Sequence, residues 1–156
     1  MAIEIGQVAP DFTLKNPTGE DVTLSSFRGD RNVVLVFFPG AFSDVCTKQW
    51  GAIGEHGGRY SQDDAQVLGI SVDSRYSLGK FAAELGLADA VLLADFHPKG
   101  GVSSNYGVYR KDLGFSGRAS FVIDKAGVVR GVSLTDVPSE IPDEEDYFEA
   151  LAVCEA

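Results

Sequence analysis

The amino-acid sequence predicts an α/β fold in which a mixed central sheet is flanked by helices. The continuous apolar run of residues 33–38 is typical of a strand that is covered on both faces. After this run, segments with a helical spacing of apolar residues alternate with short apolar strands. A pair of β-prone segments around a turn stands near each end of the chain, and such hairpins add antiparallel strands to the sheet.

The first elements lead from a hairpin into the central strand and a helix. Residues 12–14 and 22–24 are β-prone and enclose the turn-forming stretch KNPTGED. The helix is predicted over residues 44–56, where Ser43 or Asp44 would be the N-cap, and the glycine pair that follows is expected to end it. The remaining predicted elements are a strand at 65–72, a helix at 74–85, a strand at 90–95, a hairpin of strands 121–124 and 128–134, and a helix at 142–154.

Composition limits the classes of partner. The chain has 156 residues, of which 44% are apolar, and we expect one domain over residues 1–156. The net charge of −10 argues against binding to nucleic acid or to an anionic membrane surface. The N-terminus lacks the basic start and long apolar run of a secretory signal, and no stretch approaches the ~20 apolar residues of a membrane span. These observations favour a cytoplasmic protein, in which thiols stay reduced.

One cysteine occupies a chemically special position. Cys46 falls in the first turn of the predicted helix that follows Ser43, beyond the carboxyl end of strand 33–38. Ligands of α/β sheets bind at this end of the strands, and free backbone N–H groups stabilise an anion there. The pKa of a cysteine, ordinarily ~8.5, falls to between ~3.5 and ~7.5 in such settings. Placement alone leaves two interpretations open: a reactive thiolate, or a buried and inert cysteine.

The residues around Cys46 resemble a known signature. Pro39, Ser43 and Cys46 read P-x-x-x-S-x-x-C, which resembles the active-site motif of the peroxiredoxins. The resemblance extends to further segments in the same order, namely VAPDFTL at 8–14, LLADFHPKGGVSSNYGVYR at 92–110 and GRASFVIDKAGVVR at 117–130. Among the subgroups the chain looks most like the alkyl hydroperoxide reductase E type, usually one-cysteine enzymes. The resemblance implies a thioredoxin-like fold with an N-terminal β-hairpin extension.

The family implies a role for each matched residue. A peroxiredoxin is a thiol-dependent peroxidase that reduces hydrogen peroxide and organic hydroperoxides through a cysteine sulfenic acid. By resemblance Cys46 attacks the peroxide, Ser43 offers a hydroxyl, Arg118 holds the thiolate and the peroxide, and Pro39 limits access of water. Neither a metal nor an organic cofactor is implied. The family also leads us to expect a homodimer.

Two features depart from the common pattern or leave it open. Serine replaces the commoner threonine at position 43, and Gln49 stands where the subgroup often has glutamate. The step that regenerates the thiol is open as well. Cys154 shares a helix face with Tyr147 and Leu151, which makes it most simply a core-facing thiol. The alternative is a resolving cysteine that reaches a sulfenic acid in its own chain or in a partner subunit. If Cys154 does not resolve, an external thiol or a small redox protein must reduce the enzyme.

Two other functional classes compete with a peroxidase. A thioredoxin-fold thiol-disulfide oxidoreductase normally needs C-x-x-C, but the first position of that motif is Ser43 here. A non-catalytic thioredoxin-like module would require an inert Cys46, and packing alone does not explain the combination of Pro39, Ser43 and Arg118.

Overall fold

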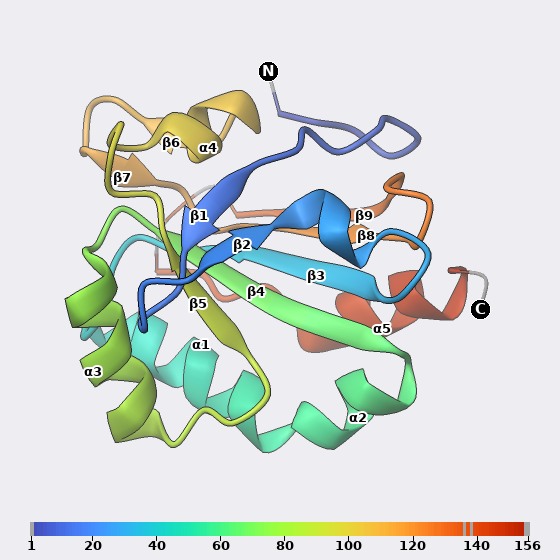
Figure 1. The fold of residues 1–156 in the computed structure, drawn as a ribbon, viewed down its shortest axis with the longest axis horizontal. Coiled ribbons are helices and arrows are strands. Elements are labelled where there is room, and N and C mark those ends of the chain that lie inside the picture. The colour runs from blue at the N-terminus through green and yellow to red at the C-terminus, as the bar shows by residue number, and fades with distance from the viewer. Residues whose placement is uncertain (1, 136, 138, 155–156) are drawn as a thin grey trace.

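A mixed sheet of seven strands forms the centre of the molecule. The computed structural model describes residues 2–135, 137 and 139–154, and its main sheet has the strand order β2-β1-β5-β4-β3-β8-β9 (Figure 1). β3 and β4 are parallel, as are β4 and β5, whereas the other pairs are antiparallel. The strands are β1 (Thr13–Lys15), β2 (Asp21–Thr23), β3 (Asn32–Phe37), β4 (Ala65–Ser71), β5 (Val91–Ala94), β8 (Ala119–Ile123) and β9 (Val129–Leu134). The predicted α/β class and mixed sheet are confirmed.

β3 explains why the core has two halves. Side chains of a strand alternate between faces, and all six residues of β3 are buried. Val34 and Val36 join an apolar cluster with α1, α2, α3 and α5, while Val33 and Leu35 join a second cluster with α4 and the N-terminal segment. Because both faces of β3 are covered, its side chains after Asn32 are all apolar.

The helices are α1 (Asp44–Glu55), α2 (Gly57–Gln62), α3 (Arg75–Leu85), α4 (Gly101–Asn105) and α5 (Glu144–Ala152), with a 3-10 turn at Leu24–Phe27. α1, α3 and α5 begin and end close to the predicted residues, whereas α2 and α4 were not among the predicted elements. Ser43 caps α1 and Ser74 caps α3 through their hydroxyl oxygens. Gly86 takes the left-handed conformation that ends α3, with φ of 64°.

α1 ends just before the glycine pair, as predicted, but a second helix that was not predicted follows directly. α1 stops at Glu55, but α2 starts at Gly57 and runs through both glycines. Tyr60 joins this short helix to α5, because its buried ring lies 4.7 Å from that of Phe148 and its hydroxyl donates to Glu144 at 2.7 Å. Packing onto α5 therefore overrides the low helix propensity of glycine.

A small hairpin was not predicted. β6 (Tyr109–Arg110) pairs with β7 (Phe115–Ser116) in a separate two-stranded sheet above the main one (Figure 1). Strands of two residues carry too little alternation to be recognised in a sequence. The hairpin matters for the site described below, because its second strand leads directly to Arg118.

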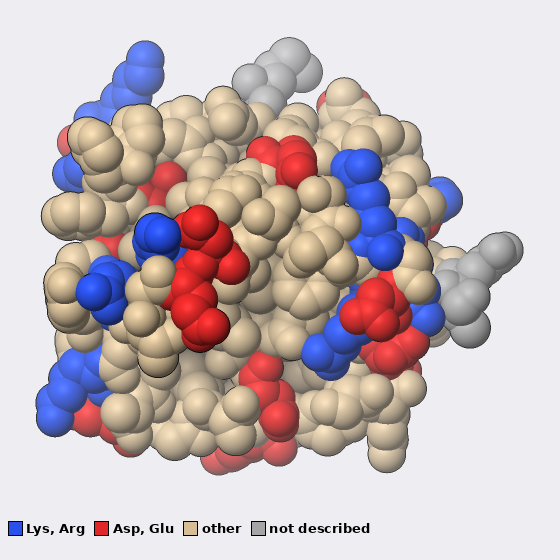
Figure 2. All heavy atoms as spheres, in the orientation of Figure 1, with Lys and Arg blue, Asp and Glu red and all other residues tan. Residues whose placement is uncertain are grey.

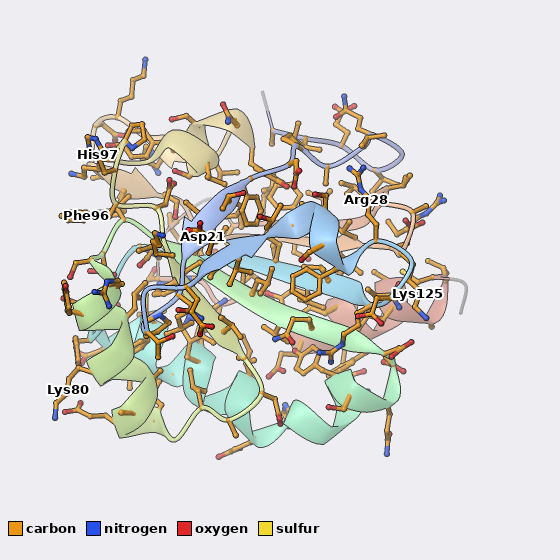
Figure 3. All side chains as sticks on the ribbon, in the orientation of Figure 1. Asp21, Arg28, Lys80, Phe96, His97 and Lys125 are labelled. Atoms are coloured by element: carbon orange, nitrogen blue, oxygen red, sulfur yellow. The ribbon has the colours of Figure 1, made fainter. Side chains whose placement is uncertain are left out.

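Charges of both signs share the surface. Arg28 and Lys125 lie on the side of the molecule where β3 and β4 begin, and acidic side chains adjoin the basic ones there (Figures 2 and 3). Lys125, for example, forms an ion pair with Asp64 at 2.6 Å. Among the described residues, no helix is long and apolar enough to cross a membrane.

Candidate active site

The loop after β3 brings Pro39, Ser43 and Cys46 to the carboxyl edge of the sheet. β3 ends at Phe37, and the chain crosses Pro39 before α1 begins. The Cys46 N–H donates to Ser43 Oγ at 3.3 Å, and the Thr47 N–H donates to the Ser43 carbonyl at 2.9 Å. Ser43 is thus the N-cap, and Cys46 occupies the first turn as the sequence predicted. Because the Cys46 N–H is engaged with Ser43, an incoming oxygen would compete with Ser43 Oγ for this donor.

Arg118 reaches Cys46 from a distant part of the chain. It directly precedes β8, whose Ala119 pairs with Phe37 at the end of β3, so the antiparallel register carries the guanidinium to the start of α1. Arg118 Nη1 lies 3.3 Å from Cys46 Sγ. Both side chains are buried, Cys46 with 0% and Arg118 with 2% of its surface exposed. Thr135 supports the arginine backbone by donating its N–H to the Arg118 carbonyl at 3.2 Å.

Gln49 holds the same guanidinium nitrogen. Its Oε1 accepts from Arg118 Nη1 at 2.6 Å, and it is buried one helical turn after Cys46. On its other side stands Tyr147, which is hydrogen-bonded to Ser120 across 2.5 Å. Burial raises the pKa of Tyr147 to about 12, against the effect of hydrogen bonding with Ser120 and Gln49. The amide keeps Arg118 in position and adds no negative charge.

A pocket opens over the buried sulfur. It has a volume of about 520 Å³, and its lining combines the loop, the start of α1 and the β6–β7 hairpin, namely Pro39, Gly40, Ala41, Ser43, Asp44, Val45, Phe115, Arg118 and Ser139. Most of the lining is apolar. Cys46 itself is not exposed, but Ser43 and Arg118, which both contact it, line the pocket.

The arrangement suits nucleophilic attack by sulfur. A guanidinium N–H aimed at the sulfur stabilises negative charge there, and the water-poor surroundings strengthen this interaction. Because Arg118 also lines the pocket, its fork of N–H donors can bind an oxygen that approaches the sulfur. Charge that moves to a leaving oxygen would develop next to the same donors.

Two residues that hold the loop were missed by the sequence analysis. The Ser116 hydroxyl donates to the Phe38 carbonyl at 3.2 Å, and Asp73 Oδ2 accepts from the Ala41 N–H at 2.8 Å. These anchors lie on either side of Pro39. A signal for Asp73 was present, because it follows β4, whose carboxyl end lies beside that of β3 in the parallel pair.

Cys154 lies far from Cys46. It follows α5 and is half-buried against the apolar cluster, where its thiol donates to the Ala150 carbonyl at 3.4 Å. Asp63 and Asp124 act on its pKa, and both lie near the start of β3, because the Asp63 carbonyl accepts from the Asn32 side chain and Asp124 follows Ile123, the partner of Val33. Cys46 lies beyond the carboxyl end of β3, at the opposite end of the strand from these two aspartates. The six residues of β3 span roughly 17 Å. A disulfide needs Cα atoms within about 7 Å.

The pH dependence of Cys154 alkylation follows from its surroundings. Burial, helped by Asp124, raises the pKa of this thiol from 9.0 to about 11. We expect the alkylation rate of Cys154 in folded Cys46→Ser protein to rise about tenfold per pH unit from pH 7 and to level off near pH 11. In urea the plateau should come about two units earlier. Mass-spectrometric rates across this range measure both, and a folded-state plateau at pH 9 would contradict the assignment.

The raised pKa of Cys154 also makes the free energy of unfolding depend on pH. Below pH 9 the thiol is protonated in both states and contributes no pH dependence. Between pH 9 and about 11 the unfolded chain loses this proton first, so Cys154 lowers the free energy of unfolding as the pH rises.

The histidines contribute nothing to this site. His97 lies exposed at the margin of the molecule (Figure 3), and His56 pairs with Glu144 at 3.1 Å. No group of three His, Cys, Asp or Glu side chains within the described ranges is placed to hold a metal ion.

Comparisons with known proteins agree with this geometry. The model of the AhpC/TSA family matches residues 5–132. Alkyl hydroperoxide reductase E of Mycobacterium tuberculosis is 36% identical over 154 residues, with 99% of both chains covered. Mouse peroxiredoxin-2 is 35% identical, with 86% of this chain and 71% of the relative covered. The crystal structure of the peroxidoxin BcpB of M. tuberculosis superimposes with a TM-score of 0.82 at 32% identity and covers 96% of this chain and 95% of its own. The chain therefore belongs to the AhpC/TSA family and is, as a peroxiredoxin, a thiol-dependent peroxidase.

Proposed function

We propose that Cys46 is the peroxide-reacting thiol of this enzyme and that Arg118, Ser43 and Pro39 complete its site. The observation that carries the proposal is the 3.3 Å contact between Arg118 Nη1 and Cys46 Sγ at a helix N-terminus beneath a pocket. A buried guanidinium aimed at a sulfur stabilises the thiolate, which is the form that attacks a peroxide. The relatives named alkyl hydroperoxide reductase and peroxiredoxin support a hydroperoxide as the substrate.

The proposed reaction has two stages. The Cys46 thiolate attacks the nearer oxygen of the hydroperoxide, the O–O bond breaks, and the leaving oxygen takes a proton to become water or an alcohol. Arg118 and the Ser43 hydroxyl stabilise the charge that moves to the leaving oxygen. The sulfenic acid then condenses with a reductant thiol, releasing water, and a second thiol reduces the mixed disulfide to restore Cys46. No metal or organic cofactor takes part.

We propose that the reductant is external. Cys154 and Cys46 lie at opposite edges of the sheet, and Cys154 is a half-buried thiol of raised pKa. Both features disfavour Cys154 as the resolving cysteine within its own chain, and its burial and raised pKa disfavour it in a partner subunit as well, so we propose a small thiol or a small redox protein as the reductant. From the family resemblance we also propose a homodimer that acts in the cytoplasm.

One experiment tests the thiol and the reductant together. Wild-type protein and the Cys154→Ser variant are treated with one equivalent of hydrogen peroxide, trapped with a sulfenic-acid reagent and examined by mass spectrometry. We expect sulfenic acid on Cys46 in both proteins. Oxidation elsewhere would refute the role of Cys46, and a disulfide between residues 46 and 154 in the wild type alone would refute the external reductant.

A further inference from the structure

We propose that Asp73 is a positioning residue for peroxide reduction, because it fixes the loop that carries Pro39 and Ser43. This inference rests on the proposed role of Cys46. Asp73 follows β4 and does not line the pocket. Its action is therefore indirect: it holds the backbone from which the pocket residues project.

The hydrogen bonds of Asp73 reach the middle of the loop. Asp73 Oδ2 accepts from the Ala41 N–H at 2.8 Å and from the Ser71 hydroxyl at 2.7 Å. Ala41 lies midway between Pro39 and Ser43, so this bond fixes both. Ser71 in turn accepts from the Asp73 N–H at 3.3 Å, which orients the carboxylate toward the loop. Hydrogen bonds to a carboxylate are stronger than those between neutral groups.

The loop needs this anchor because its backbone is strained. Phe42 has φ of 68°, in the left-handed region that is unfavourable for residues other than glycine. Such a conformation persists only where the surroundings enforce it. Its ring is held edge-on against Phe81, with centroids 5.2 Å apart, and Asp73 holds the N–H of the preceding residue, Ala41. Phe42 nevertheless remains 49% exposed, so packing alone holds it weakly.

Loss of the anchor should disturb the approach of peroxide more than the sulfur itself. The contacts of Cys46 with Arg118 and of Arg118 with Gln49 come from α1 and the start of β8, and none passes through residues 39–42. Pro39, Gly40 and Ala41 form one wall of the pocket. If the loop relaxes, the sulfur keeps its guanidinium partner, but the surface that orients the peroxide is lost.

The test compares Asp73→Ala, Asp73→Asn and the wild type. Trp50 is the only tryptophan, is buried one turn after Cys46 and lies edge-on to Phe38 at 5.3 Å, so its fluorescence should report oxidation of Cys46 in a stopped-flow experiment. We expect Asp73→Ala to lower the second-order rate constant for hydrogen peroxide about 10- to 100-fold. The rate of Cys46 alkylation by iodoacetamide should stay the same or rise.

The asparagine variant distinguishes the hydrogen bond from the charge. Its side-chain oxygen can still accept from Ala41 and Ser71, and we expect a rate constant within about threefold of the wild type. If Asp73→Asn is as slow as Asp73→Ala, or if Asp73→Ala reacts at the wild-type rate, the proposal is wrong.

Asp124→Ala is the matched structural control. Asp124 accepts backbone N–H bonds from Ala126 and Val128 at 2.9 Å in the turn between β8 and β9, far from the pocket. We expect it to lower the thermal midpoint yet leave the peroxide rate constant unchanged at temperatures where the protein is folded. If Asp124→Ala lowered the peroxide rate constant as much as Asp73→Ala does, lost stability would explain the Asp73 effect, and the positioning role would be refuted. Failure of the proposed function would appear differently, as a Cys46→Ser variant that still turns over peroxide.

Discussion

Replacing Cys46 by serine is expected to abolish peroxidase turnover, with a loss of at least about 1,000-fold in the rate constant. A serine hydroxyl is not ionised near neutral pH and cannot form a sulfenic acid, so the first stage of the reaction has no nucleophile. Arg118 and Gln49 would remain in place, since their mutual bond of 2.6 Å does not involve the sulfur. Turnover can be measured with hydrogen peroxide and a small thiol such as dithiothreitol as the reductant.

Cys154→Ser is the control for that loss. It removes the other cysteine of the chain, which lies at the opposite edge of the sheet. We expect its turnover to stay within about threefold of the wild type, because residue 154 is neither in the pocket lining nor at the Arg118–Cys46 contact. A Cys46→Ser variant with substantial turnover, or a Cys154→Ser variant as inactive as Cys46→Ser, would contradict the assignment.

Replacing Arg118 by alanine should have the second largest effect, a loss of about 100- to 1,000-fold in the rate constant for Cys46 oxidation. The variant removes the donor that lies 3.3 Å from the sulfur and lines the path of the peroxide. It also leaves the buried Gln49 Oε1 without its guanidinium donor. Stopped-flow fluorescence of Trp50 measures the rate, and thermal unfolding shows whether the variant is folded.

Arg118→Lys separates charge from geometry. A lysine preserves the positive charge but offers a point charge in place of a planar guanidinium that contacts Gln49 and Cys46 through Nη1 and also lines the pocket. We therefore expect Arg118→Lys to remain at least tenfold below the wild type. If the alanine variant reacted within a few-fold of the wild-type rate, Arg118 would be a structural arginine only.

Local features of the sequence predicted much of the fold. The apolar run at residues 33–38 supplied five of the six residues of β3, because a strand buried on both faces is mostly apolar. Ser43 marked the start of α1 and Gly86 the end of α3, since capping depends on residues within a few positions of each other. The unpredicted helix α2 has a non-local cause, because Tyr60 packs on Phe148, 88 positions away.

The residues of the site also fall into two groups, those that local sequence features predicted and those that only the tertiary structure placed. Pro39, Ser43 and Cys46 lie within eight positions, so their place near the start of one helix could be predicted from the sequence. Residue 118 was matched by family resemblance alone, and its distance from the sulfur depends on the antiparallel register of β3 and β8. Gln49 appeared in the sequence as a neighbour without a partner.

The sequence by itself determined the order of the main-sheet strands and of the three longer helices, the position of Cys46 in the first turn of a helix, and the family. Only the tertiary structure decided that Arg118 and Gln49 meet at the sulfur, that Asp73 holds the loop, and that Cys154 lies at the far edge of the sheet. The physical reason is how far apart along the chain the interacting residues lie. Caps and periodicity arise from neighbours along the chain, whereas these contacts depend on strand register and on helix packing, which bring together residues far apart in sequence.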